Sequence, residues 1–554
     1  MMKKRIIFLL MLLITLTSCK ANQLTPSDEY KDDPQVIDFI NISYDEHLET
    51  LTINSTFKNQ TGEKIKIYLN RELIVLGNME TEDTYSSFTY PITFTSKQNL
   101  VTVVITTNLS LVFYKDETFY IESEEPIIPI EPVDENNLYV SSNASSNGNG
   151  TIENPYRLEE AILKIVPGGT INVLPGIYLF DKTIVIPFGN NGIKDKMKKI
   201  NGIGDVKFDF SLQAYGNPSK VSNPRGLALE ASFWHISNIT FYGAADNGMY
   251  ISGNDNIIDN CVFEANRDSG LQLGRRNSSL TKIVDWPSRN LIINCTSFNN
   301  YDPDNGEDAD GFACKLTTGY DNVFDGCISY HNTDDGYDLF TKSETGPIGP
   351  VTLINCLAFN NGVTKDGLYT KDSDGNGFKL GGSNISVEHQ VINCASFNNR
   401  SHGFTDNSNP GRITLRNLTS FGNGQAKSSS NFDFARQDNS NNLFSHLLSF
   451  GNASLTSDKF RGEAEYSVFY NTKQYYLFTI LAPCDQKISS MRGEKINVTN
   501  QDFYSTSFMK IVNPHKDLRN EHNEVDLKDF LKIRETSPLY KAGLNGNFIG
   551  AIFD

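Results

Sequence analysis

A short segment that ends in asparagine recurs between residues 259 and 452, and this repeat constrains the fold more than any other feature. Seven segments align without gaps: DNCVFEAN, INCTSFNN, DGCISYHN, INCLAFNN, INCASFNN, RNLTSFGN and SHLLSFGN. One column holds Cys261, Cys295, Cys327, Cys356, Cys394, Leu418 and Leu447, and five residues later a second holds Asn266, Asn300, Asn332, Asn361, Asn399, Asn423 and Asn452. The rows lie from 24 residues (Cys394 to Leu418) to 38 residues (Cys356 to Cys394) apart, so a constant frame alternates with turns that accept insertions.

A strand-rich and helix-poor unit of this length predicts a parallel β-helix over residues 138–554. Asparagines at equivalent turns then stack as a ladder. We expect free, buried thiols in the cysteine column, because neighbouring coils lie about 4.8 Å apart and a disulfide takes a Cβ separation of about 3.8 Å. The segment RLEEAILKIV at residues 157–166 predicts a helix that covers the open N-terminal end of the solenoid, and the C-terminal end needs similar cover.

The residues before the solenoid divide into four predicted segments. Residues 1–19 have a basic start and an apolar run, and they end in LTSC, which resembles the lipobox of bacterial lipoproteins with Cys19 as the lipidated residue. A tether at residues 20–35 leads to alternating segments at 36–122, which predict a small immunoglobulin-like β-sandwich, either a spacer or a carbohydrate-binding module. A linker rich in proline and acidic residues follows at 123–137.

These features predict an extracytoplasmic protein, secreted or held at the bacterial cell surface by an N-terminal lipid anchor in the membrane. The formal net charge of −17 and the pI near 5.0 argue against nucleic acid as a partner, because phosphate binding needs a basic surface. An acidic protein still binds a polyanion where metal ions mediate the contact.

The segment NTDDGYDLF at residues 332–340 places Asp334, Asp335 and Asp338 close together in what otherwise reads as a buried strand. Each coil also carries a glycine shortly after the repeated asparagine, at Gly270, Gly311, Gly336, Gly377 and Gly403. With this glycine as the reference, Asp310 falls in the column of Asp335, and Lys379 falls in the column of Asp338. The sequence therefore predicts one compact surface site that contains these four aspartates and the lysine.

Four neighbouring carboxylates raise one another's pKa unless a cation is present. Ca²⁺ suits them because it accepts six to eight oxygen ligands, whereas zinc prefers histidine and thiolate. His331 and His402 are expected to be solvated turn residues. Two alternatives stay open: the ion is a structural clip, or it takes part in chemistry, and Lys379 is either a salt-bridge partner of Asp338 or a general base whose pKa the dication lowers.

A dication beside a lysine fits β-elimination of a uronic acid polymer. The metal neutralises the uronate carboxylate and stabilises the charge that develops when the C5 proton leaves. A base must then take that proton, and the glycine reference places Lys379 for this role.

The pattern DADGF, NTDDGYD and GNGFKLGG, with repeat rows between, resembles the pectate lyases of polysaccharide lyase family nine. The resemblance covers the chain from about residue 138 onward. It implies a right-handed parallel β-helix and calcium-dependent cleavage of pectate (polygalacturonate), an acidic plant polysaccharide. Carried over residue by residue, it implies that Ca²⁺ is bound by Asp310, Asp334, Asp335 and Asp338, and that Lys379 is the base.

Several points stay open at the level of sequence. Arg400 and Arg412 are candidates to bind a neighbouring sugar carboxylate, or ordinary surface arginines. The long charged turn GVTKDGLYTKDSDGNG before Lys379 matches no family motif, and Asp308 lacks support from other rows. Competing functions are a rhamnogalacturonan or other uronan lyase, a polygalacturonase-type hydrolase with two catalytic carboxylates, and a polysaccharide-binding lipoprotein without catalysis.

Overall fold

The chain divides into two compact units, Met1–Pro129 and Ile130–Asp554. The computed structural model describes residues 39–120, except 46–48, 57–61, 71, 83–84, 93, 95–97 and 108–111, and residues 136–553, except 146, 217–222, 427, 438–440, 480–481, 486–492 and 509–512. The predictions for the signal peptide with Cys19, the tether and most of the linker lie outside these residues. No helix within the described ranges is long and apolar enough to cross a membrane.

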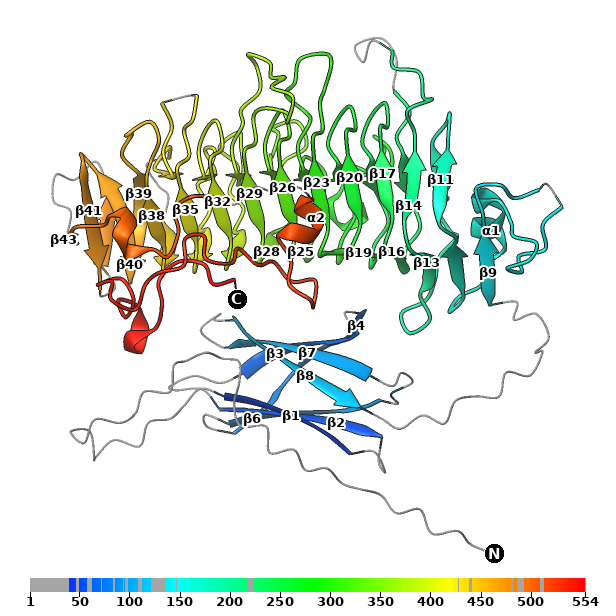
Figure 1. Ribbon diagram of the computed structural model, residues 1–554, viewed down its shortest axis with the longest axis horizontal. Coiled ribbons are helices and arrows are strands. Elements are labelled where there is room, and N and C mark those ends of the chain that lie inside the picture. The colour runs from blue at the N-terminus through cyan, green and yellow to red at the C-terminus, as the bar shows by residue number, and fades with distance from the viewer. Residues whose placement is uncertain are drawn as a thin grey trace, which may run out of the picture. The chain divides into compact units, whose positions relative to one another are not determined.

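The first unit contains two four-stranded antiparallel sheets (Figure 1). One sheet consists of β1 (Phe39–Asp45), β2 (Thr50–Thr56), β6 (Tyr85–Pro91) and β5 (Glu80–Glu82), and the other of β4 (Glu72–Asn78), β3 (Gly62–Leu69), β7 (Gln98–Thr107) and β8 (Val112–Tyr120). Alternate residues of β2 are buried, as the two-residue period of a strand requires. Leu51 and Ile53 of the first sheet share a core with Ile67 and Val103 of the second, which confirms the predicted small β-sandwich.

The second unit is a solenoid whose coils contribute strands to three parallel sheets, which we call sheets I, II and III (Figure 1). Sheet I contains β9 (Asn137–Val140), β10 (Thr170–Val173), β13 (Lys198–Gly202), β16 (Trp234–Ser237), β19 (Ile257–Asp259), β22 (Leu291–Ile293), β25 (Asn322–Asp325), β28 (Val351–Ile354), β31 (Gln390–Ile392), β34 (Thr414–Arg416), β37 (Asn442–Ser445) and β39 (Lys459–Glu465). Sheet II contains β11 (Gly176–Leu179), β14 (Val206–Asp209), β17 (Thr240–Tyr242), β20 (Val262–Glu264), β23 (Thr296–Phe298), β26 (Ile328–Tyr330), β29 (Leu357–Phe359), β32 (Ala395–Phe397), β35 (Thr419–Phe421), β38 (Leu448–Phe450) and β40 (Ser467–Asn471).

Sheet III carries the residues of the predicted site. It contains β12 (Ile184–Ile186), β15 (Leu227–Leu229), β18 (Met249–Ile251), β21 (Leu271–Leu273), β24 (Phe312–Cys314), β27 (Tyr337–Asp338), β30 (Phe378–Lys379), β33 (Phe404–Thr405) and β36 (Phe432–Phe434), and it continues into the start of β39. Inward side chains of this sheet stack from coil to coil, with ring centroids 4.7 Å apart for Tyr337 and Phe378 and 4.6 Å apart for Phe378 and Phe404. These rings fill the interior, so the alternate residues face outward.

The interior also contains the cysteine column. Cys261, Cys295, Cys327, Cys356 and Cys394 are free and buried, as predicted. Each thiol is a small apolar filler of the core, stacked on its equivalent in the next coil.

The asparagine ladder forms at the turn that follows sheet II. The Nδ2 atom of Asn300 donates to Asn332 Oδ1 at 2.7 Å, and Asn332 Nδ2 donates to Asn361 Oδ1 at 3.0 Å. The ladder ends differently from the prediction, because Asn423 Nδ2 donates to Asn431 Oδ1 at 3.0 Å. The expected last member, Asn452, instead turns its Nδ2 to Thr456 O within its own loop.

Both ends of the solenoid are covered. The helix α1 (Leu158–Lys164) buries Leu158, Ala161 and Ile162 against the first strands of the solenoid and confirms the helix predicted there (Figure 1). At the other end, β42 (Ala482–Asp485), β41 (Gln474–Phe478) and β43 (Glu494–Ile496) pair antiparallel and interrupt the parallel stacking.

The last part of the chain returns along the side of the solenoid. It contains the helix α2 (Pro514–Asp517) and the short 3-10 segments Asn500–Asp502 and Leu544–Gly546, and a further 3-10 segment, Ile283–Asp285, lies in an earlier loop. The Ile552 amide donates to Asn393 Oδ1 at 2.7 Å, and Arg519 donates to the carbonyls of Gly326 and Cys295. These contacts tie the C-terminal segment to several coils.

Candidate active site

The carboxylates lie in turns that lead from sheet II into sheet III. Between β26 and β27, the Ser329 hydroxyl donates to the Gly336 carbonyl oxygen at 2.9 Å and accepts from Asn332 Nδ2 at 3.0 Å. A Cβ atom on Gly336 would lie 2.5 Å from a carbonyl oxygen of the next coil, so only glycine fits without a shift. The stacking of the coils therefore fixes the backbone that carries Asp334 and Asp335.

Three of the predicted ligands meet in this region. One carboxylate oxygen from each of Asp310, Asp334 and Asp335 lies within 4.8 Å of the others, and all three side chains are buried. Backbone N–H groups orient them: Asp310 Oδ1 accepts from Asp335 N at 3.2 Å, and Asp335 Oδ1 accepts from Asn376 N at 2.6 Å. Asp334 Oδ1 likewise accepts from Asp374 N at 2.6 Å. We call these three side chains the carboxylate group.

Lys379 faces outward from β30 and lies in register with Asp338 of β27, as the glycine reference predicts. Its Nζ lies 3.1 Å from Asp335 Oδ2 and 2.9 Å from Asp374 Oδ2, so the described residues do not pair it with Asp338. Asp374 comes from the long charged turn that sequence reasoning left unassigned. That turn therefore reaches the proposed base directly.

A second buried lysine, Lys315, lies beside the carboxylate group, and sequence reasoning missed it. Its Nζ is 2.7 Å from Asp310 Oδ2 and 3.1 Å from Asp338 Oδ2, and a longer contact of 3.4 Å reaches Asp308. Asp338 therefore pairs with Lys315 and stands apart from the carboxylate group, while its Oδ1 accepts from the Phe340 amide at 3.0 Å.

The electrostatics of the site follow from burial. Burial, reinforced by neighbouring carboxylates, raises the pKa of Asp334 well above its usual range and that of Asp335 to about 6. Burial lowers the pKa of Lys379, but the surrounding aspartates outweigh it and raise that pKa well above the ordinary value. The Lys379 amine therefore holds its proton as long as the carboxylates around it keep their charge.

The donor set fits a hard divalent cation. Asp310, Asp334 and Asp335 supply buried oxygens, and the close partner of Asp335 Oδ2 is the Lys379 ammonium at 3.1 Å, which a bound dication would displace or neutralise. Oxygen donors of this kind suit Ca²⁺, and the three-residue group contains neither the histidine nor the thiolate that zinc favours. Asp338 would join such an ion only by leaving Lys315.

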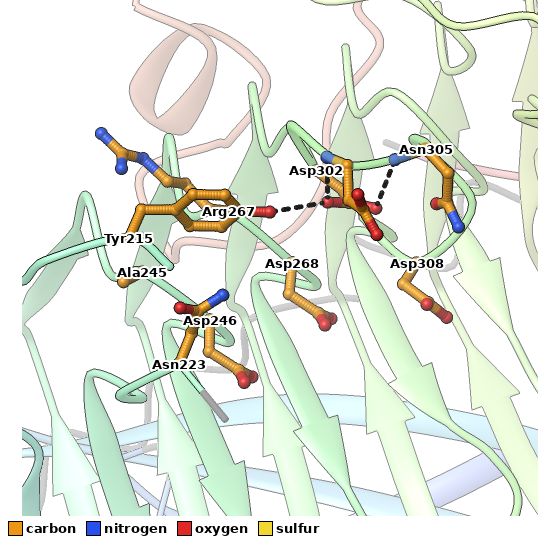
Figure 2. Close-up of a pocket in the computed structure, with 10 residues that line it drawn as sticks. Tyr215, Asn223, Ala245, Asp246, Arg267, Asp268, Asp302, Asn305 and Asp308 are labelled. Atoms are coloured by element: carbon orange, nitrogen blue, oxygen red, sulfur yellow. Dashed lines mark hydrogen bonds between the residues drawn. The ribbon is translucent and has the colours of Figure 1, made fainter. Parts of the chain in front are cut away.

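An acidic cavity of about 260 Å³ opens beside this site, toward the earlier coils (Figure 2). It is lined by Tyr215, Asn223, Ala245, Asp246, Arg267, Asp268, Asp302, Asp304, Asn305 and Asp308. Asp302 accepts from Tyr215 Oη at 3.4 Å. Burial raises the pKa of Asp268 to about 8, and the carboxylates of Asp246 and Asp308 add to the shift. With five aspartates and one arginine in its lining, the cavity is unfavourable for a further anion.

The two arginine candidates have other partners. The Arg400 guanidinium lies 4.1 Å from the centre of the Tyr369 ring, on the long turn before Lys379. Arg412 Nη2 lies 3.6 Å from Glu463 Oε2. In the described residues neither arginine has an ion pair with the carboxylate group.

The prediction that both histidines are solvated turn residues is wrong for His402, which is only 7% exposed. His402 Nε2 lies 3.2 Å from Asp433 Oδ2, in the coil after Lys379. His331 is half-buried, and its Nδ1 lies 3.2 Å from Val363 O. Both side chains pack beneath inserted turns, whose lengths the repeat does not specify.

The fold and the site define a parallel β-helix protein with buried carboxylates and lysines on one outer sheet. The family model described as Pel9A-like, right handed beta helix region matches residues 138–442, and the chain belongs to this family.

Known relatives agree with that assignment. "Pectate lyase L" of Paenibacillus polymyxa is 43% identical over 417 residues, which are 75% of this chain and 85% of the relative. "Pectate lyase L" of Thermoclostridium stercorarium is 41% identical over 317 residues, 56% of this chain and 25% of that protein. The solved structure of pectate lyase Pel9A superposes with a TM-score of 0.56 at 25% identity, covering 75% of this chain and 96% of that chain. These findings confirm the resemblance and the right-handed β-helix that the sequence implies.

Proposed function

We propose that this chain is a calcium-dependent pectate lyase that cleaves polygalacturonate by β-elimination. The observation that carries the proposal is the position of Lys379, whose Nζ lies 3.1 Å from Asp335 Oδ2 at the edge of the carboxylate group. The relatives named pectate lyases support the same substrate class. An acidic plant polysaccharide is therefore the proposed partner.

The carboxylate group is proposed to hold the calcium ion, through Asp310, Asp334 and Asp335. When bound, such an ion neutralises the uronate carboxylate and stabilises the negative charge that develops there as the C5 proton leaves. Each of the three aspartate side chains accepts a hydrogen bond from a backbone N–H group, which keeps it oriented before substrate arrives.

Lys379 is the proposed base. Its Nζ takes the C5 proton, the electrons of that C–H bond form a double bond between C4 and C5, and the bond from C4 to the glycosidic oxygen breaks. Water supplies the proton that the departing oxygen needs. The amine must be neutral to act, and the surrounding aspartates hold its pKa high. Lys379 is therefore competent only when the charge of those aspartates is compensated.

A hydrolase is less well supported by the same residues. Glycosidases place two carboxyl groups on either side of the scissile bond, roughly 5 Å or more apart. Here the carboxylates crowd into one group within 4.8 Å, with lysines against them. That arrangement favours proton abstraction beside a neutralised acid.

The test follows the double bond that elimination creates, through the ultraviolet absorbance of its conjugation with the uronate carboxylate. Wild-type protein with Ca²⁺ is expected to raise this absorbance on polygalacturonate, and a chelator to abolish the rise. Lys379→Ala is expected to lower the rate on the order of 10²- to 10⁴-fold, as loss of a general base does.

Lys371→Ala is the matched control, because Lys371 lies in the same long turn with its side chain 89% exposed. It is expected to keep wild-type activity. A full rate in Lys379→Ala would show that the base is misassigned. If the absorbance rises on rhamnogalacturonan and not on polygalacturonate, rhamnogalacturonan is the substrate. If it rises on neither polymer, a hydrolase or a binding protein is favoured.

A further inference from the structure

The outward residues of sheet III form one row that continues past Lys379 toward the C-terminus. Strand pairing places Lys379 beside Thr405, Thr405 beside Asp433, and Asp433 beside Lys459. Because paired strands lie about 4.8 Å apart, Asp433 lies about 10 Å and Lys459 about 14 Å from Lys379 along the row. A polymer that reaches the base and follows this row passes over both.

A compact charged cluster surrounds Asp433. The Asp433 Oδ2 atom lies 3.3 Å from Arg436 Nε and 3.7 Å from Lys459 Nζ. The Asp433 carboxylate is only 2% exposed, whereas the side chains of Arg436 and Lys459 are 36% and 43% exposed. The aspartate thus holds both cations in place while their side chains stay partly exposed. Arg436 Nη1 also donates to Asn407 Oδ1 at 2.8 Å, so within the described contacts its Nη2 and the Lys459 ammonium are the donors left for a ligand.

The remaining titratable neighbours do not reverse this positive surface. His402 Nδ1 accepts from the Ser430 amide at 3.2 Å, and burial lowers the pKa of His402 to about 4, so its ring is neutral. Asp406 is fully buried, and burial raises its pKa to about 7. Asp458, the residue before Lys459, is also fully buried, and burial raises its pKa to about 7.

On the side of the earlier coils, the acidic cavity beside Asp308 lies in the turns that precede sheet III. Five aspartates and one arginine, Arg267, line it, so a polyanion is disfavoured there. Charge therefore favours one direction for the anionic sugars of a bound chain, from Lys379 toward Lys459.

We propose that Arg436 and Lys459 form a subsite that binds the carboxylate of a further uronate residue of the same polymer. This proposal rests on the proposed function, because it assumes that the bound chain is a polyuronate whose cleaved bond lies near Lys379. Arg436 supplies a planar guanidinium and Lys459 an ammonium, and both form charge-assisted hydrogen bonds to a carboxylate. The subsite lengthens the binding surface without taking part in the chemistry.

The experiment compares Arg436→Gln, Lys459→Gln and the double variant with wild type on galacturonate oligomers of increasing length. The double variant is expected to show a roughly tenfold higher KM on long oligomers, the loss of about one charge-assisted contact, with kcat retained. On oligomers too short to reach the row at Lys459, the double variant and wild type are expected to agree.

Arg289→Gln is the matched control, because Arg289 is an exposed arginine paired with Asp255 at 2.7 Å in a turn outside the row. An equal KM rise in this control, or an unchanged KM in the double variant, overturns the subsite. Calorimetric titration of long galacturonate oligomers into Lys379→Ala, with and without the double substitution, separates the two proposals. Weaker binding in the substituted protein supports the subsite even if wild type releases no unsaturated product, and equal binding refutes it.

Discussion

At the scale of single residues, the site combines predicted and unpredicted groups. Alignment on the repeated glycine located Asp310, Asp335 and Lys379, because parallel pairing in register places equivalent residues of neighbouring coils side by side. Lys315 lies four residues after Gly311 and could have been found by the same reference, but no other row repeats a lysine there. Asp374 had no such signal, since its position depends on how an inserted turn folds back over Lys379.

The raised pKa of Asp335 predicts how calcium binding depends on pH. In the metal-free folded protein this pKa is about 6, whereas the unfolded chain loses the proton near 3.8. The folded state therefore holds more protons in that window, and the stability of the metal-free protein falls as pH rises through it. Ca²⁺ binds the ionised carboxylate and competes with the proton, so the stabilisation by Ca²⁺ is expected to grow as pH rises past about 6.

Thermal unfolding with Ca²⁺ and with chelator, on both sides of pH 6, measures this effect. Asp335→Asn, which cannot ionise, is expected to weaken the pH dependence of the calcium shift. A calcium shift of equal size on both sides of this pH would contradict the assignment of Asp335 as a ligand.

At the scale of elements, the repeat predicted the coils because each row packs on its equivalent. The stacked Asn300, Asn332 and Asn361 amides and the cysteine column are direct consequences of that equivalence. The prediction was wrong at Asn452, where Asn431 enters the ladder only eight residues after Asn423. An alignment of rows cannot register a residue from another part of the coil that takes over the same hydrogen bond.

The turn between β26 and β27 depends on Gly336, and a larger residue there is expected to disturb the stacking of the coils. In Gly336→Ala the new Cβ would lie 2.5 Å from the Gly377 oxygen and 2.9 Å from the Ala358 Cβ. Such overpacking is expected to destabilise the protein by about 1–3 kcal/mol and to weaken calcium binding, because Asp335 adjoins the glycine. Thermal unfolding and calcium titration measure both effects.

Ser343→Ala, an exposed position in the loop after β27, serves as the control and is expected to change neither quantity. Unchanged stability in Gly336→Ala would mean that the coils separate more easily than their contacts indicate.

At the scale of the whole molecule, the sequence separated a β-sandwich from a solenoid because residues 36–122 show only strand alternation, whereas the row that ends in asparagine recurs between residues 259 and 452. The sequence left the role of the sandwich open. All the residues of the candidate site and of the proposed subsite lie in the unit Ile130–Asp554, which has a core of its own. A protein that begins at residue 130 is therefore expected to fold and to keep the wild-type kcat on short galacturonate oligomers.

The KM of the shortened protein on polygalacturonate then distinguishes the two possible roles of the first unit, a spacer and a carbohydrate-binding module. If the β-sandwich is a spacer, the shortened protein keeps its KM on polygalacturonate. If it is a carbohydrate-binding module, KM rises on the polymer and not on the oligomers, because a second attachment raises the effective concentration only for a chain long enough to span both units. A loss of kcat on short oligomers in a protein with an unchanged unfolding midpoint would contradict a site confined to the solenoid.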